Sequence, residues 1–327
     1  MTAQVLVVGS FNVDHVWTLD SLPAPGETRS GAYASGPGGK GFNQAVAAAR
    51  SGASTRFACA VGDDAGGQYA RALAVADGID LRDAVADAPT GSAGIFVDAG
   101  GRNSIVVAPG ANDALEASHV HAAFDVADAP RVVLAQLETP AASAQAAFAL
   151  ARSAGAFAIL NPAPANVPVT AELLALVDLL TPNETEFAAL ARAHLGIALD
   201  PSTLAAATDA ELHALCRRLL PRGGVVVTLG AAGVFVSHAA HALRGDANAC
   251  YRLPARDVTV ADTTGAGDAF NGALAASLSA STERPFASHT RYAVAYAGLS
   301  TERHGAASSM PSRDDVAGRF PDATGPA

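Results

Sequence analysis

The sequence predicts an α/β protein of three layers, with a mostly parallel central sheet between two layers of helices. Short apolar runs alternate with longer alanine-rich segments along the chain of 327 residues, and this alternation is typical of successive βαβ units. Hydrophobic residues make up 50% of the chain, so a large core is available. We expect one domain over residues 1–327, since α/β domains often exceed the usual domain length.

The expected elements follow in order along the chain. Apolar runs predict buried strands at Val5–Val8, Arg56–Val61, Val132–Gln136, Phe157–Leu160, Leu176–Leu180 and Val225–Leu229. Alanine-rich or amphipathic runs predict helices at Asn43–Ser51, Gly66–Ala76, Ala141–Ser153, Ala171–Leu176, Glu184–Ala193, Asp209–Leu219 and Asp268–Ser279. The uncharged stretch Gly223–Leu243 is long enough to span a bilayer, but its glycines favour two buried strands joined by a turn. We expect a loop at Gly196–Asp209 and a frayed tail after Arg319.

Two regions break the alternation of strands and helices. Asn12–Leu19 and Thr28–Ser35 have strand character with no helix between them, and Ser92–Asp98 and Asn103–Val107 predict a hairpin. We expect these regions, about 12–35 and 92–107, to form a small separate sheet. Such a sheet is too thin to be stable alone, so it should act as a lid over a cleft or as a contact in a homodimer.

Composition limits the possible partners and the location. The net charge of −10 disfavours a nucleic-acid surface. Cys59, Cys216 and Cys250 lie far apart without metal-ligand spacing, which favours free thiols in a reducing compartment. The first ten residues, MTAQVLVVGS, have no basic region before their apolar run and predict a strand instead of a signal peptide. We therefore expect a cytoplasmic protein with neither a nucleic-acid nor a membrane partner.

The first glycine-rich motif, GPGGKGFNQA, runs from Gly36 to Ala45 and opens a helix. Glycines let the backbone approach a ligand closely, and the start of a helix offers free N–H groups. The motif is not a Walker A loop, because Gly41 follows Lys40 where Ser or Thr is needed. On its own it predicts either a ligand-binding loop or only a tight turn into a helix.

The second motif, DTTGAGDAFNG, runs from Asp262 to Gly272 after an expected strand at Asp257–Ala261. Gly265, Ala266 and Gly267 can present successive backbone N–H groups to an anion. Asp268 could be a helix cap, but a cap does not need three small residues before it. Phosphoryl transfer needs an anion cradle beside an acceptor for the proton of the attacking hydroxyl. We therefore predict Gly265–Gly267 as the cradle and Asp268 as the catalytic base.

Taken together, the two motifs resemble the two signatures of the ribokinase-like (PfkB) carbohydrate kinases. Segments in the same order extend the resemblance over nearly the whole chain: Asn12–Asp14, Pro25–Thr28, Gly62–Asp64, Gln136–Glu138, Asn161–Pro164, Thr181–Glu186 and Thr228–Gly230. The resemblance implies the ribokinase-like three-layer fold with its β lid, a homodimer formed through the lid, and ATP-dependent phosphorylation of a small sugar, first of all D-ribose.

The resemblance also implies roles for individual residues. The sugar is expected at Asn12, Asp14, Gly39, Lys40, Asn43, Glu138 and Asp268. The nucleotide is expected at Asn183, Thr228, Gly230, Gly233, Gly267 and Val294. Mg²⁺ is expected to bind through water near Glu186, the acid of the family's N-x-x-E pattern. A monovalent cation, K⁺, is expected beside the cradle at Asp262, Thr264, Ser300, Arg303, Gly305 and Ser309.

Some positions depart from the family pattern. Phe42 replaces a small residue, and its ring either narrows the sugar pocket or packs behind it. Val294 stands where relatives often have a polar residue near the adenine. The alternatives are a kinase of the same family for a nucleoside, deoxyribose or a ketohexose, and a catalytically weak sugar-binding regulator. Asn12 favours ribose over 2-deoxyribose, because its polar group is left unpaired when the 2-hydroxyl is missing.

Overall fold

A nine-stranded sheet forms the centre of the computed structural model, which describes residues 4–281 and 283–324. The strand order is β13-β12-β11-β10-β9-β8-β1-β4-β5, and all neighbours are parallel except the pairs that β12 makes. The strands are β1 (Val5–Val8), β4 (Thr55–Gly62), β5 (Asp80–Ala86), β8 (Val132–Ala135), β9 (Phe157–Leu160), β10 (Leu179–Leu180), β11 (Gly224–Thr228), β12 (Val234–Ser237) and β13 (Cys250–Leu253).

Helices cover both faces of this sheet and bury its side chains in two cores. Val5 and Val7 of β1 face one core, whereas Leu6 and Val8 face the other, as the alternation along a strand requires. The first core is covered by α1 (Lys40–Arg50), α2 (Ala65–Ala76), α8 (Ala266–Ala280), α9 (Phe286–Ser300), α10 (Arg313–Arg319) and α11 (Pro321–Thr324). The second is covered by α3 (Ala117–Ala123), α4 (Ala141–Ala154), α5 (Ala171–Leu174), α6 (Glu184–Leu195) and α7 (Asp209–Leu219).

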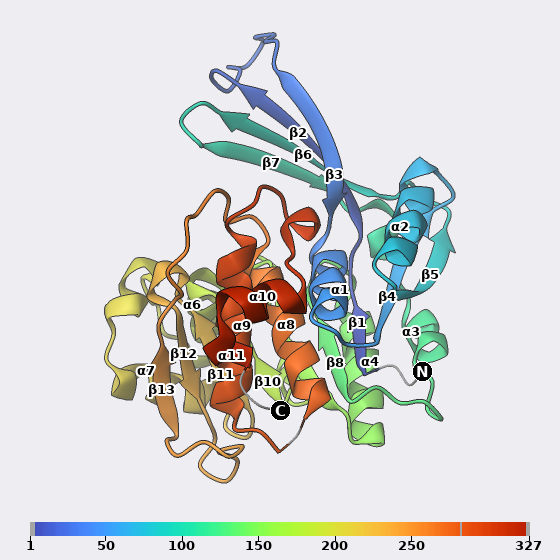
Figure 1. Ribbon diagram of the computed structural model, residues 1–327. Helices are drawn as coiled ribbons and strands as arrows, with labels where there is room; N and C mark the ends of the chain where they lie inside the picture. Colours follow the sequence, from blue (N-terminus) through green and yellow to red (C-terminus); the bar gives the residue numbers. More distant parts are fainter. Residues whose placement is uncertain (1–3, 282, 325–327) are drawn as a thin grey trace.

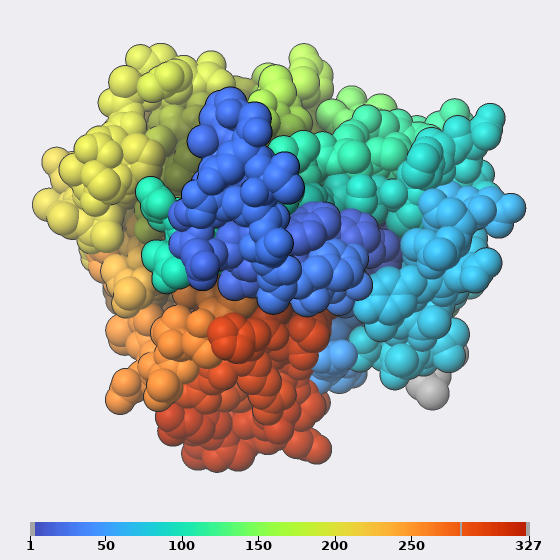
Figure 2. Space-filling view, turned by 90° about the horizontal axis from the view of Figure 1, so that it is seen from above, coloured from blue at the N-terminus to red at the C-terminus, as the bar shows by residue number. Residues whose placement is uncertain are grey.

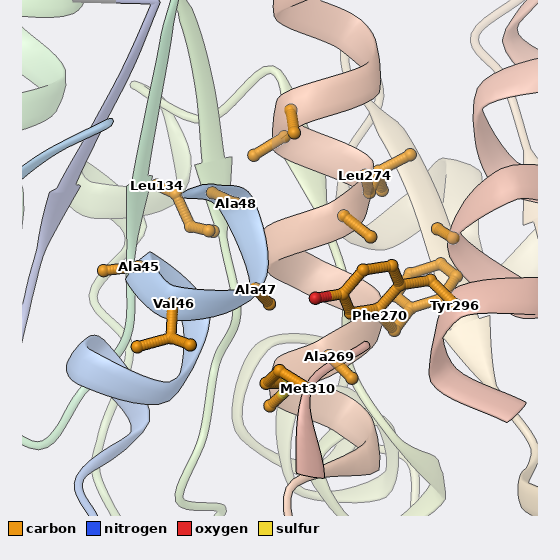
Figure 3. Close-up of a cluster of buried hydrophobic side chains, with 14 of the residues drawn as sticks. Ala45, Val46, Ala47, Ala48, Leu134, Ala269, Phe270, Leu274, Tyr296 and Met310 are labelled. Carbon is orange, nitrogen blue, oxygen red and sulfur yellow. The ribbon is translucent and has the colours of Figure 1, made fainter. Parts of the chain in front are cut away.

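Helices α1 and α8, which carry the two glycine-rich motifs, pack closely together in the first core (Figure 3). Gly272 makes this approach possible. A β-carbon at Gly272 would overlap the carbonyl oxygen of Gln44 and would lie 2.6 Å from the β-carbon of Ala47. The absence of a side chain at one position therefore sets how near the first motif lies to the second.

A separate four-stranded sheet forms the lid, in the order β3-β2-β6-β7. Its strands are β2 (Asn12–Leu19), β3 (Ala32–Gly38), β6 (Gly91–Asp98) and β7 (Asn103–Ala108). It projects from one edge of the main unit, at the top of Figure 1. Seen from above, its dark blue residues lie across the middle of the face, with yellow segments on one side and orange and red ones on the other (Figure 2).

Most of the predicted elements are confirmed with ends that differ by a few residues. The uncharged stretch Gly223–Leu243 forms β11 and β12, joined by the turn η3 (Gly230–Ala232). Among the described residues, no helix combines the length and the apolar character needed to cross a membrane. The expected loop Gly196–Asp209 contains a 3₁₀ turn, η2 (Pro201–Ala206), and ends as α7 begins.

Two expectations about local structure are wrong. Asp257–Ala261 is not a strand: β13 ends at Leu253, and Pro254 has no N–H with which to continue the ladder. The tail after Arg319 is ordered as far as Thr324, because Phe320 and Ala323 pack into the first core at 8% and 2% exposure. The remainder of the predicted tail, residues 325–327, lies outside the described residues.

Candidate active site

The second motif meets the carboxyl ends of the central strands, where the loops that follow β8, β9 and β10 converge. Gly265 adopts a left-handed conformation (φ 75°) as the N-cap of α8, and a β-carbon there would lie 2.9 Å from that of Ala306. The N–H of Ala266 donates to the carbonyl oxygen of Thr263 (3.2 Å), whereas that of Gly267 has no acceptor among the described residues. Gly267 is open, since a β-carbon there would meet nothing within 4 Å. These features suit an anion at the start of α8.

Asp268 lies in the first turn of α8, and two amides from α1 hold its carboxylate. Asn43 Nδ2 donates to Oδ2 and Gln44 Nε2 donates to Oδ1, both at 2.9 Å. Burial raises the pKa of Asp268, and the charge of Lys40 and the hydrogen bonds from Gln44 and Asn43 oppose that rise. The carboxylate is therefore more basic than an exposed aspartate and is fixed in orientation.

Gln44 is the centre of a buried amide network that sequence reasoning missed. Its Nε2 also donates to Oδ1 of Asn161 (3.0 Å), and its Oε1 accepts a hydrogen bond from Nε2 of Gln136 (2.6 Å). Gln136 and Asn161 directly follow β8 and β9. Asp268, the predicted base, is thus braced against two strands of the main sheet.

The same network continues to the anion cradle. Asn161 Nδ2 donates to the carbonyl oxygen of Thr181 (3.0 Å), and Thr181 Oγ1 donates to Oδ1 of Asn271 (2.6 Å). Asn271 Nδ2 in turn donates to the carbonyl oxygen of Gly267 (2.8 Å). The predicted cradle and Asp268 are therefore supported by one hydrogen-bond network.

A small cavity of about 170 Å³ brings predicted residues from both motifs together. Its lining includes Lys40, Asn183, Glu186, Thr228, Gly265, Ala266, Gly267 and Asp268. Burial lowers the pKa of Lys40, but the carboxylates of Asp268, Glu138 and Glu186 outweigh burial and leave it raised. Lys40 is therefore a cation at neutral pH. It lines the same cavity as the first residues of α8, whose N–H groups could bind an anion.

The polar residues of the lid face the same region from strand β2. Burial, together with the charges of Glu138 and Asp268, raises the pKa of Asp14 to about 6. Its carboxylate accepts no hydrogen bond from a described residue, and it fills the space that a β-carbon at Gly38 would occupy. Asp14 is free to accept hydrogen bonds from a ligand.

Asn12 is oriented by Asn112, a residue that sequence reasoning also missed. Asn112 Nδ2 donates to Oδ1 of Asn12 (2.8 Å), and its Oδ1 accepts from the backbone N–H of Phe11 (3.0 Å). The Nδ2 of Asn12 is then left to donate to a ligand. The sequence signal was an asparagine two residues after Pro109-Gly110, which equally indicates an ordinary turn.

Glu138 and Gly39, two positions at which the sugar is expected, lie close to the starts of α1 and β2. Glu138 Oε2 accepts hydrogen bonds from Ser10 Oγ (2.6 Å) and the backbone N–H of Lys40 (2.8 Å). Gly39 has a φ of 88°, and a β-carbon there would lie 2.9 Å from the backbone nitrogen of Asn12. The backbone at Gly39 therefore packs closely against that of Asn12, and its expected contact with the sugar stays a prediction.

The N-x-x-E segment forms a capping box at the start of α6. Asn183 accepts from the N–H of Glu186 (2.9 Å), and Glu186 Oε2 accepts from the N–H of Asn183 (2.9 Å). Burial raises the pKa of Glu186, partly offset by the N–H of Asn183 and by Lys40. Glu186 is therefore both the structural cap of α6 and a carboxylate in the active-site cavity.

The remaining nucleotide-side positions are more dispersed. Thr228 lines the cavity, and the turn of Gly230 and Gly233 leads away from it with φ angles of 52° and 87°. Val294 is 7% exposed in the first core and does not line this cavity.

The expected cation loops are tied together by Asp262. Its Oδ1 accepts from the backbone N–H and the hydroxyl of Thr264 (2.9 and 2.6 Å), and its Oδ2 accepts from the N–H of Gly305 (2.9 Å). Burial acts to raise the pKa of Asp262, but these hydrogen bonds lower it. The hydroxyls of Ser300 and Ser309 donate to nearby carbonyls, both at 2.8 Å. Arg303 is exposed beside them.

Comparison with known proteins identifies the family. The sequence profile of the pfkB family of carbohydrate kinases matches residues 2–313. The chain belongs to this family. A ribokinase of Haemophilus influenzae is 37% identical over 322 residues, covering 97% of this chain and 98% of that protein.

Solved structures agree with this assignment. The ribokinase of Giardia lamblia superposes with a TM-score of 0.83 at 27% identity, covering 98% of this chain and 99% of that one. The ribokinase of Arabidopsis thaliana, solved with ribose and ATP, gives a TM-score of 0.81 at 30% identity, covering 97% and 98%. The chain is thus an ATP-dependent carbohydrate kinase of the pfkB family.

Phe42, the first of the predicted departures from the family pattern, does not line the cavity beside Asp268. It is 1% exposed, and its ring packs against Phe11 and Phe57 with centroid distances of 5.1 and 6.0 Å. The ring thus packs in the first hydrophobic core, which favours the second of the two alternatives for Phe42.

Proposed function

We propose that this kinase transfers the γ-phosphoryl group of ATP to the 5-hydroxyl of D-ribose, yielding ribose 5-phosphate and ADP. One observation carries the assignment of the acceptor side. Asn43 Nδ2 donates to Asp268, while Asn43 Oδ1 is buried without a partner among the described residues. A sugar hydroxyl satisfies this oxygen and lies beside the base at the same time.

The residues can carry the reaction without a covalent intermediate. Asp268 accepts the proton of the attacking hydroxyl as that oxygen bonds to the γ-phosphorus and the bond to the β-phosphate oxygen breaks. Lys40 and the amides at the start of α8 offset the charge on the phosphate oxygens. The raised pKa of Asp268 favours proton uptake, and its bonds to Asn43 and Gln44 keep the acceptor oxygen in place.

Two metal ions fit the donor sets present. Glu186 and Asn183 offer oxygen atoms that suit Mg²⁺ held through water, and bound Mg²⁺ supplies charge neutralisation at the phosphates. Asp262 joins the loops at Thr264 and Gly305, whose backbone carbonyls suit a K⁺ ion beside the cradle. Both ions belong to the proposal.

The acceptor sugar is tested with a substrate panel of ribose, 2-deoxyribose, fructose and adenosine, read through ADP release with ATP, Mg²⁺ and K⁺. We expect the highest kcat/KM for ribose. Asn112 donates a hydrogen bond to Oδ1 of Asn12, so Nδ2 of Asn12 is left to donate to the 2-hydroxyl of ribose. Replacing Asn12 with leucine should reduce the preference for ribose over deoxyribose. Equal efficiency of the unaltered enzyme on both sugars would remove the argument from Asn12.

We also propose that the kinase is a cytoplasmic homodimer that pairs through its lid. His15, Trp17, Tyr33 and Phe96 form an aromatic group on the lid, with Trp17 stacked on Phe96 at 5.2 Å. Pairing in register places these four on the face opposite Asn12 and Asp14. Light scattering at micromolar concentration tests this, and a monomer would count against it.

A further inference from the structure

A second, larger cavity lies at the amino ends of the central strands, whereas the active site lies at their carboxyl ends. Its volume is about 810 Å³, which falls in the range of small-molecule sites. Val132 and Phe157, the first residues of β8 and β9, contribute to its wall, together with the last turns of α4 and α8. We call it the basal pocket and define it by Arg131, Arg152, Phe157, Asp178, Arg244 and Arg284.

The basal pocket concentrates positive charge in an acidic protein. Four arginines line it, and Asp178 is the one carboxylate among its described lining residues. The whole chain carries a net charge of −10. Guanidinium groups that share a cavity repel one another unless an anion lies between them, so their gathering here points to an anionic ligand.

The four arginines have few partners of their own. None of them makes an ion pair within 4.0 Å, counting partners at residues 4–281 and 283–324. Arg131 donates to the carbonyl oxygen of Ser279 (3.0 Å), and Arg152 donates to that of Ala175 (2.9 Å). Each guanidinium carries five N–H donors, so most of them remain available to a ligand.

Arg244 gives the strongest single indication. It is the one non-glycine residue with a positive φ (53°) in the described part of the chain. Its guanidinium lies over the ring of Phe157 at 4.2 Å from the centroid. Its Nε is buried without a hydrogen-bond partner among the described residues. An unfavourable backbone conformation thus holds an unsatisfied donor at the wall of the cavity, which is typical of a binding site.

We propose that the basal pocket binds a small anion that carries phosphate groups, of the size of a nucleoside diphosphate or smaller. The four guanidinium groups and the carboxylate of Asp178 leave a net positive charge in the pocket. A phosphate ligand balances more of this charge than a ligand with a single carboxylate does. The planar donor fork of arginine also matches the oxygens of a phosphate group. This site is separate from the active site, which lies at the carboxyl ends of the same strands.

Isothermal titration calorimetry of the full-length kinase with pyrophosphate tests the proposal. The variant Arg131→Gln/Arg244→Gln should weaken pyrophosphate binding at least tenfold. The matched control is Arg192→Gln/Arg222→Gln, which removes two exposed arginines outside the pocket and should bind like the unaltered protein. Circular dichroism reports whether each variant folds. Arg284→Gln, a single change at a half-buried residue, serves as an independent second variant and should also weaken binding.

A titration with ADP distinguishes the two sources of phosphate. Two ADP sites per unaltered chain and one per variant would assign the pocket to a nucleotide. One ADP site in both, with pyrophosphate binding still weakened in the variant, would assign it to a smaller phosphorylated ligand. Pyrophosphate bound equally by the unaltered protein and both pocket variants, or not bound at all, would overturn the proposal. The pyrophosphate measurement needs no kinase activity, so it stands whether or not ribose is the acceptor.

Discussion

The amide of Gln44 sets how readily Asp268 ionises, and the variant Gln44→Leu tests this directly. The change removes the hydrogen bond to Oδ1 of Asp268 (2.9 Å) together with that to Asn161 (3.0 Å). The Gln44 bond is among the interactions that hold down the pKa of the buried Asp268 carboxyl. Its loss should therefore raise that pKa further.

The size of the effect follows from the value of a hydrogen bond to a charged group, about 1.5–3 kcal/mol. The base must be ionised to accept a proton, so activity is lost as pH falls through its pKa. In the acidic limb of the pH profile, kcat/KM for the sugar should fall about 10- to 100-fold relative to the unaltered enzyme. On the alkaline plateau the loss should be much smaller. Initial rates of ADP release across the pH range measure both.

Gln136→Leu is the matched control. It removes the hydrogen bond from Gln136 to Oε1 of Gln44 (2.6 Å) but none to Asp268. We expect a loss of stability in both variants and a displaced acidic limb only in Gln44→Leu. A folded Gln44→Leu enzyme whose acidic limb coincides with that of the unaltered enzyme would refute this reasoning.

Three further outcomes are expected. Asp268→Asn should lower kcat by about 10²–10⁴-fold while equilibrium binding of ribose persists; unchanged turnover would contradict its role as base. Gly272→Ala should lower the free energy of unfolding, measured with denaturant, by about 1–3 kcal/mol. The added methyl would overlap the carbonyl oxygen of Gln44 and lie 2.6 Å from the β-carbon of Ala47. Gly267→Ala is the control, and it should leave the free energy of unfolding unchanged because the space around Gly267 is open. Asp262→Asn should raise the K⁺ concentration that gives the half-maximal rate about tenfold, because the change weakens the hydrogen bonds that join the cation loops. If the rate of the unaltered enzyme does not depend on K⁺, the proposed cation site is excluded.

Local sequence patterns were sufficient for many buried elements of the fold, although α9 (Phe286–Ser300) was not predicted despite its ten buried residues. Val5–Val8 and Phe157–Leu160 are continuous apolar runs, and Asp209–Leu219 follows a capping box at Thr208 and Glu211. The edge strand β5 was missed because its sequence, DLRDAVA, has charged residues and is only half-buried. The strand expected at Asp257–Ala261 was wrong because its valines had no neighbouring strand with which to pair.

The candidate site was predictable where one motif supplies several of its parts. The cradle and Asp268 come from a single turn, and the structure places Lys40 and Glu186 beside them. The supporting amides could not be assigned from sequence. Gln44, Asn161 and Asn271 come together only when the sheet has aligned the ends of its strands, and each residue alone indicates nothing more than a polar side chain.

Residues that touch in the site lie far apart in the sequence, which affects when the site can form during synthesis. Asn43 and Asp268 are 225 residues apart in the sequence, and Asn12 and Asn112 are 100 apart. The lid is complete only when β2 has paired with β6, which is synthesised much later than β2. Contacts of such long range form late in folding. A nascent chain emerging from the ribosome therefore lacks its proposed base, Asp268, until 268 of the 327 residues have been added. Chains that end before Asp268 contain the sugar-side residues Asn12 and Asn43 but not the proposed base, so we expect them not to transfer phosphate from ATP.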